Sequence, residues 1–184
     1  MITSTNNEMN LQPENLANDL IKLVPLRPED FESLYSIAAD PLIWEQHPNR
    51  DRCERDVFQN FFDEAIKSKN AFIILDLKND ETIGSSRFYE YEKEKKSVAI
   101  GYTFLAREYW GGIYNRTVKS IMLDYAFQYV DTVIFHIAGE NLRSQKAADK
   151  IGAKKTNLVK ETFNGDLKIG SLIFELKKID WENK

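Results

Sequence analysis

Two adjacent glycines, Gly111 and Gly112, stand directly before the most regular helical pattern of this 184-residue chain. The first backbone N–H groups of a helix have no intrahelical acceptor, and the helix dipole places partial positive charge beside them. Glycines let a bulky anion approach the backbone, and Arg116 adds a full positive charge. This pattern is typical of a phosphate-binding turn, but it also fits a plain tight turn.

The residues around these glycines exclude two common nucleotide-binding loops. A Walker loop requires Gly-Lys-Ser/Thr, and a dinucleotide fingerprint requires Gly-x-Gly-x-x-Gly; neither pattern occurs here.

A second group of polar residues follows one predicted strand later. Asn141 stands at the start of a short predicted helix, where its side chain is a good N-cap, and Ser144 falls at the third helical position. By type alone both are ordinary helix residues. Their functional meaning comes from their pairing with the glycine turn upstream.

The remaining reactive side chains indicate no metal or thiol chemistry. Cys53 is the only cysteine, which excludes an intrachain disulfide and a cysteine-rich metal site, and we interpret it as a surface thiol. His47 is a candidate to line a pocket beside Trp44, whereas His136 lies in a predicted strand and is given a structural role. We expect no metal site.

Hydrophobic periodicity predicts the elements that position these residues. Helices are expected over residues 28–40 and 57–66, from after Gly112 to residue 129, and over about 142–151, the last one stopped by Gly152. Strands are expected over residues 23–26 (an edge strand, because it contains Pro25), 71–77, 82–91, Ser97–Leu105, Thr132–Ala138, 153–163 and 167–176, with the last two joined by a turn at Asn164 and Gly165.

The order of these elements predicts an α/β (α+β) fold with a mixed, mostly antiparallel sheet and helices on both faces. Three consecutive strands form an antiparallel meander, and the strand–helix–strand passage over residues 97–138 forms one central parallel crossover. Residues 1–20 are polar and are expected to form a flexible N-terminal arm, with a single domain over residues 21–184.

Composition limits the partners and the location. The net charge of -4 and the pI near 5.4 give no reason to expect nucleic acid as a partner. No apolar run approaches the ~20 residues of a membrane span, and the N-terminus does not resemble a signal peptide. We expect a cytoplasmic protein without a membrane partner, and a homodimer remains an open alternative.

Two blocks of residues together resemble a known family. Residues 100–105 with Tyr109, Trp110 and the two glycines form the first block, and residues 141–153 form the second. In this order and spacing, residues 23–181 resemble a GNAT (Gcn5-related) N-acetyltransferase of the branch related to ribosomal-protein N-terminal acetyltransferases. The usual family loop reads Gln/Arg-x-x-Gly-x-Gly/Ala, and here Trp110, Ile113 and Asn115 stand in the three specified places.

The resemblance implies a role for each matching position, with acetyl-CoA as co-substrate. Phe104 and Leu105 would offer backbone groups to the pantetheine arm. The turn formed by Trp110, Gly111, Gly112, Ile113, Tyr114 and Asn115, with the amide of Arg116, would bind the pyrophosphate. Asn141 would contact the pantetheine, and Ser144 would lie near the thioester sulfur, where we expect it to donate a proton to the departing thiolate.

The acceptor is expected to be a primary amine. A peptide or protein N-terminus is ranked first, because an α-amine of pKa ~7.8 needs little help to lose its proton. A polyamine or an aminoglycoside is ranked second, and a non-catalytic coenzyme A-binding protein is the alternative from another class. Glu90 is the candidate general base, with an ordinary exposed carboxylate as the competing interpretation. Trp44, Tyr89 and Tyr102 are candidate substrate-pocket residues, while Arg50, Arg52 and Arg55 weaken any acidic field near Trp44.

Overall fold

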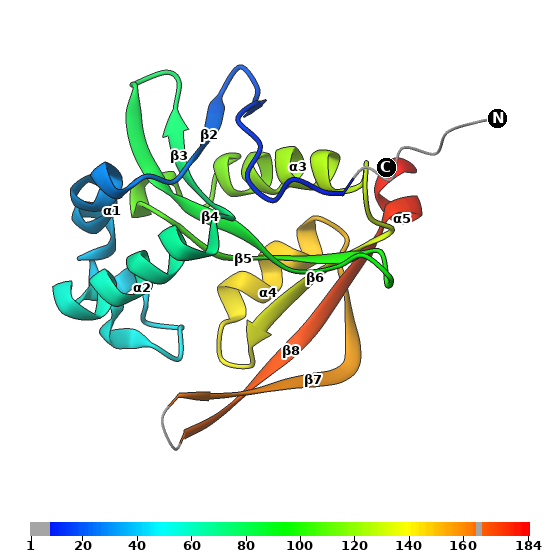
Figure 1. Cartoon of the computed structure of the whole chain (residues 1–184). Helices are drawn as coiled ribbons and strands as arrows, with labels where there is room; N and C mark the ends of the chain where they lie inside the picture. Colours follow the sequence, from blue (N-terminus) through cyan, green and yellow to red (C-terminus); the bar gives the residue numbers. More distant parts are fainter. Residues whose placement is uncertain (1–7, 165–166) are drawn as a thin grey trace.

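The computed structural model describes residues 8–164 and 167–184, which form one mixed sheet of eight strands in the order β1-β2-β3-β4-β5-β6-β8-β7 (Figure 1). The strands are β1 (Leu16–Ala17), β2 (Ile21–Pro25), β3 (Ala71–Asp76), β4 (Glu81–Glu92), β5 (Ser97–Leu105), β6 (Thr132–Ala138), β7 (Lys154–Asn164) and β8 (Leu167–Lys177). The helices are α1 (Phe31–Ala38), α2 (Arg55–Ser68), α3 (Tyr114–Ala126), α4 (Leu142–Lys150) and α5 (Lys178–Glu182).

The predicted fold class is confirmed. Neighbouring strands pair antiparallel except β5 and β6, which are parallel and are joined through α3. The bounds of β5 and β6 agree with the predicted ones. The predicted turn at Asn164 and Gly165 falls partly on residues 165–166, which lie outside the described residues.

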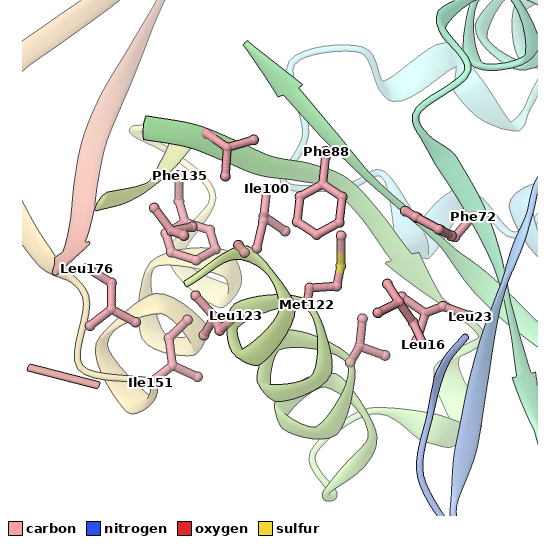
Figure 2. Close-up of a cluster of buried hydrophobic side chains, with 14 of the residues drawn as sticks. Leu16, Leu23, Phe72, Phe88, Ile100, Met122, Leu123, Phe135, Ile151 and Leu176 are labelled. Carbon is pink, nitrogen blue, oxygen red and sulfur yellow. The ribbon is translucent and has the colours of Figure 1, made fainter. Parts of the chain in front are cut away.

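Two hydrophobic clusters hold helices against opposite faces of the sheet. Side chains of α3 and α4 pack with strand residues of one face, and Figure 2 shows Phe88, Ile100, Met122 and Leu123 in this cluster. The other face is covered by α1 and α2, where Phe58 packs in a cluster rich in aromatic rings. The amphipathic patterns of α2 and α3 explain why each helix buries one side.

The segment before β2 packs against the domain. Met9 and Leu16 are buried in the α3 cluster, and Tyr125 donates a hydrogen bond to the carbonyl of Asn10 (2.7 Å). Within residues 8–20, where a flexible arm was expected, apolar side chains thus pack in the cluster beside α3. Residues 1–7 lie outside the described part of the chain.

β2 is an inner strand and not the predicted edge strand. The two-residue strand β1 pairs with it at Leu23 and Lys22. Pro25 lies beyond these pairs, so its missing N–H group removes no bond of that ladder. A strand as short as β1 leaves no periodic pattern in the sequence, which explains the error.

The sheet opens between its two parallel strands. β5 and β6 pair only at Ser97/Thr132, Val98/Val133 and Ala99/Ile134, although β5 continues to Leu105 and β6 to Ala138. A β-bulge follows in β5, where Tyr102 and Thr103 together face Ser86 of β4 and Tyr102 has a φ of 53°. The unpaired ends of β5 and β6 thus leave a gap in the middle of the sheet.

Candidate active site

A cavity occupies the gap between β5 and β6. Its lining comes from residues 100–105 of β5, residues 135–138 of β6, the start of α3, helix α4 and the segment of residues 43–52 that precedes α2. A concave site of this kind at a break in a sheet is a preferred place for ligands. Of the predicted site residues, Trp44, Tyr102, Phe104, Leu105, Trp110, Gly111, Asn115, Asn141 and Ser144 line the cavity.

The glycine turn leaves open space for an anion at the start of α3. Gly111 has a φ of 73°, and a Cβ atom added at Gly111 or Gly112 would meet no atom within 4 Å. The first helical hydrogen bond runs from the N–H of Thr117 to the carbonyl of Ile113 (2.9 Å), which leaves the preceding helical N–H groups without a helical acceptor. No acidic residue lies in the first turn. These features fit a pyrophosphate group.

The other predicted members of this turn do not line the cavity. Gly112, Ile113 and Arg116 are exposed beside it. Tyr114 points away, because its hydroxyl donates to the buried carboxylate of Asp76 (3.1 Å).

Arg143, which the sequence analysis gave no role, connects three walls of the cavity. Its guanidinium carbon lies 3.9 Å from the centroid of the Trp110 ring, and one of its amino groups donates to the carbonyl of Ile43 (2.8 Å). The indole N–H of Trp110 donates in turn to the carbonyl of Leu105 (2.9 Å). Helix α4, β5 and the segment before α2 are thereby fixed relative to one another.

The start of α4 has the predicted cap. The side chain of Asn141 accepts a hydrogen bond from the N–H of Ser144 (3.0 Å), as expected for an N-cap residue. Both residues line the cavity on the side of α4. Their positions bring the second sequence block next to the first, which is the arrangement that the family resemblance implied.

Tyr89 and His136 meet across β5 on the face of α1 and α2. The hydroxyl of Tyr89 lies 2.8 Å from Nδ1 of His136, and His136 lines the cavity. Burial lowers the pKa of His136, with the charge of Lys160 acting in the same direction, so the imidazole is neutral at pH 7. Burial raises the pKa of Tyr89, which keeps its hydroxyl protonated. His136, for which a structural role was predicted, therefore belongs to the lining of the cavity.

Glu90 lies outside the cavity lining. Its side chain is exposed and forms an ion pair with Lys160 of β7. The competing interpretation, an exposed carboxylate, agrees with this placement.

A buried lysine lies on the α3 side of the cavity. Nζ of Lys119 donates to the hydroxyl of Thr103 (2.5 Å), which lies 2.7 Å from the hydroxyl of Ser86. Burial lowers the pKa of Lys119 to about 7. The sequence offered no signal for this site, because Lys119 occupies an ordinary position of an amphipathic helix.

Five side chains lie together on the face of the sheet that α1 and α2 cover. We call this group the acceptor wall; it consists of Trp44, His47, Arg52, Phe61 and Tyr102. Trp44 is buried and anchored by a hydrogen bond from its indole N–H to the carbonyl of Ala38 (2.8 Å), whereas Tyr102 is exposed. Burial lowers the pKa of His47 to about 3, and the charge of Arg52 adds to the effect. His47 is therefore a neutral side chain of this wall.

Comparison with known proteins identifies the family. The family model for the acetyltransferase (GNAT) domain matches residues 21–154. The chain therefore belongs to the GNAT acetyltransferase family. It is an N-acetyltransferase that uses acetyl-CoA as acyl donor and an amine as acceptor, and the fold, enzyme class and co-substrate expected from the sequence are confirmed.

Solved structures share the fold at low sequence identity. A GCN5-related N-acetyltransferase from Brucella melitensis is 15% identical with a TM-score of 0.80, covering 93% of this chain and 82% of that chain. A spermidine N-acetyltransferase from Vibrio cholerae, solved with CoA and spermine, is 19% identical with a TM-score of 0.69, covering 90% and 100%. A Vibrio cholerae protein provisionally named a ribosomal-protein-serine acetyltransferase is 14% identical with a TM-score of 0.69, covering 88% and 96%. No curated protein matches the sequence.

Within residues 8–164 and 167–184, no group of three or more His, Cys, Asp or Glu side chains is arranged to hold a metal ion. No helix of this described part is long and apolar enough to cross a membrane.

Proposed function

We propose that this N-acetyltransferase acts on the N-terminal α-amine of a peptide or protein. The observation that carries the proposal is the charge of the cavity. No Asp or Glu from the described part of the chain lines it, and its charged lining residues are Arg52, Lys119 and Arg143. A polyamine or an aminoglycoside carries several positive charges and would need carboxylates there. A peptide N-terminus, which is one amine on an otherwise uncharged backbone, needs no carboxylates in the cavity.

The acid–base requirement of the reaction supports the same acceptor. An α-amine of pKa ~7.8 loses its proton at pH 7 at about 1 kcal/mol, whereas a lysine amine of pKa ~10.4 requires roughly 4–5 kcal/mol. Holding the amine in position contributes ~7–11 kcal/mol to lowering the barrier. A weak base therefore suffices. We propose that the neutral His136 accepts the proton and that Tyr89 orients its ring.

The groups that hold the donor follow the two sequence blocks. Acetyl-CoA supplies the activated acetyl thioester. The free N–H groups at the start of α3 and the side chain of Arg116 bind phosphate, and the backbone of Phe104 and Leu105 holds the arm in the gap. Asn141 contacts the arm from α4. Ser144 lies beside it and donates a proton to the departing thiolate.

A competition among acceptors tests the proposal. Purified enzyme with acetyl-CoA receives peptides with free or acetylated N-termini, spermidine and an aminoglycoside, and free thiol release is measured. We expect transfer to the free N-termini alone. Rapid acetylation of spermidine or the aminoglycoside, with no transfer to any peptide, would overturn the proposal. Mass spectrometry of a peptide that also contains lysine distinguishes the α-amine from the side-chain amine.

A further inference from the structure

Two arginines flank a single ring beside the cavity. The guanidinium carbon of Arg52 lies 4.5 Å from the centroid of Phe61, and that of Arg87 lies 4.9 Å from the same centroid. Arg87 also lies 4.0 Å from the centroid of Tyr102, and Arg52 lies 5.5 Å from that of Trp44. Two positive groups are thus held against the acceptor wall by aromatic contacts.

Neither arginine has a carboxylate partner within the described residues. No ion pair within 4.0 Å involves Arg52 or Arg87, and the nearby carboxylates of Asp51 and Glu64 are exposed. Arg87 is only 6% exposed, so most of its surroundings are protein. Buried arginines are ordinarily paired, because removing an unpaired charge from water is expensive.

The polar neighbour of Arg52 does not replace a carboxylate. Nη1 of Arg52 lies 3.2 Å from Nε2 of His47. The N–H of Asn49 donates to Nδ1 of the same ring (2.9 Å), so Nδ1 carries no proton. Because His47 is neutral, its single proton is on Nε2, and that nitrogen cannot accept a hydrogen bond from Arg52. Within residues 8–164 and 167–184, this half-buried guanidinium group therefore has no carboxylate as a partner.

The positive charge of Arg87 acts against the charged form of Arg52. Burial lowers the pKa of Arg52 to about 10, and the charge of Arg87 lowers it further. Burial also lowers the pKa of Arg87. An anion between or beside the two groups would relieve both effects, and Arg52 lines the cavity where such an anion would enter.

The position of this pair relates it to the acceptor and not to the donor. Helix α3, with its free N–H groups, packs on one face of the sheet. Arg52 and Arg87 contact Phe61 of α2, which packs on the other face. We propose that Arg52, with Arg87 adding positive charge from behind the wall, binds a carboxylate of the acceptor, so that the preferred substrate is a peptide with an acidic side chain at its second residue. This inference rests on the proposed function, because it specifies the N-terminus that the enzyme selects.

Matched peptides test the proposal on the wild-type enzyme. Three peptides begin with alanine and carry glutamate, glutamine or lysine at the second position, and free glutamate is a fourth acceptor. We expect kcat/KM for the glutamate peptide to exceed that for the glutamine peptide roughly ten- to a hundredfold, as for one or two charge-assisted hydrogen bonds. The lysine peptide should be the poorest of the three.

Variants test whether Arg52 causes the preference for the glutamate peptide. In Arg52→Gln the ratio of kcat/KM between the glutamate and glutamine peptides should fall at least tenfold. Arg50→Gln is the matched control, because Arg50 lies in the same turn, is exposed and does not line the cavity; its ratio should equal the wild-type ratio. Thermal melting and calorimetric CoA binding confirm that Arg52→Gln is folded.

The outcomes separate this inference from the proposed function. Equal rates on all three peptides would overturn the acidic preference and leave N-terminal acetylation intact. An acidic preference that persists in Arg52→Gln and Arg87→Gln would refute the assigned residues. Acetylation of free glutamate without transfer to any peptide would refute the peptide acceptor itself, and with it this inference.

Discussion

The hydroxyl of Tyr89 lies 2.8 Å from Nδ1 of His136 and so joins β4 to β6 across the intervening strand β5. The contact depends on Gly101, because a Cβ atom there would lie 2.9 Å from Cε1 of Tyr89. The glycine of β5 thus makes room for the ring that orients the imidazole. Gly101→Ala should displace Tyr89 and weaken catalysis without changing the strands around it.

Replacement of His136 tests its role as the proton acceptor. His136→Gln should lower kcat about a hundredfold at pH 7, the lower end of the range for general base catalysis. Protonation of the α-amine (pKa ~7.8) lowers the rate in both proteins, whereas protonation of His136, whose pKa is lowered from 6.5, should add a further decrease in kcat of the wild type only below pH 6.5. This decrease should be absent from the pH profile of kcat in the variant.

Tyr89→Phe is the matched control for this prediction. It removes the hydroxyl and keeps the ring, so kcat should fall less than in His136→Gln while the acidic decrease remains. An unchanged pH profile in His136→Gln would exclude the imidazole as the base.

A negative charge at the glycine turn should weaken donor binding. Gly112→Glu places a carboxylate where phosphate is expected, and a Cβ atom at this position meets nothing within 4 Å, so the fold is retained. We expect calorimetry to show a Kd for acetyl-CoA raised at least tenfold. Gly112→Ala adds bulk without charge and should bind nearly as well as the wild type; equal affinity in Gly112→Glu would place the phosphates elsewhere.

Ser144 is predicted to assist departure of the thiolate. A thiol of pKa ~8.5 is already a fair leaving group, so Ser144→Ala should lower kcat only about ten- to a hundredfold. The affinity for acetyl-CoA should change little, because the N–H of residue 144 still donates to Asn141. Single-turnover rates equal to those of the wild type would reduce Ser144 to a helix residue.

The buried Lys119 should make stability depend on pH. Its pKa is lowered from 10.5 to about 7 in the folded protein, so between these values the unfolded chain binds more protons. The free energy of unfolding should therefore rise with pH, by up to ~1.4 kcal/mol per pH unit. Lys119→Met removes this dependence.

Urea unfolding at pH 7 and pH 9 provides the measurement. The variant should be the more stable protein at pH 7, and its advantage should shrink at pH 9. A stability difference that is equal at the two pH values would show that Lys119 is not desolvated in solution.

The sequence predicted the elements that have strong periodicity. The bounds of β5 and β6 and the cap at Asn141 were obtained in this way, because each depends on local residues. β1 was missed because two residues carry no pattern.

The acceptor side of the site depends on long-range contacts and was predicted less well. Trp44 and Tyr102 were placed at the cavity, but the stacking of Arg52 and Arg87 on Phe61 joins three separate elements that no local spacing relates. One regularity of the strand could have indicated which face of the sheet His136 lies on. Its neighbours Phe135 and Ile137 are buried in the α3 cluster, so strand alternation alone directs His136 to the opposite face.

The segment between α1 and α2, residues 41–53, has a short 3-10 helix at each end and irregular turns between them, and it supplies Trp44, His47 and Arg52 to the acceptor wall. It belongs to no strand of the sheet, and the donor end of the cavity is built from β5, α3 and α4. Three of the five acceptor-wall residues can therefore be replaced within this one segment without altering β5, α3 or α4, the elements proposed to bind the donor, whereas Phe61 and Tyr102 belong to α2 and β5. The contacts from Arg143 to Ile43 and Gln46 are the ones that such a replacement must preserve.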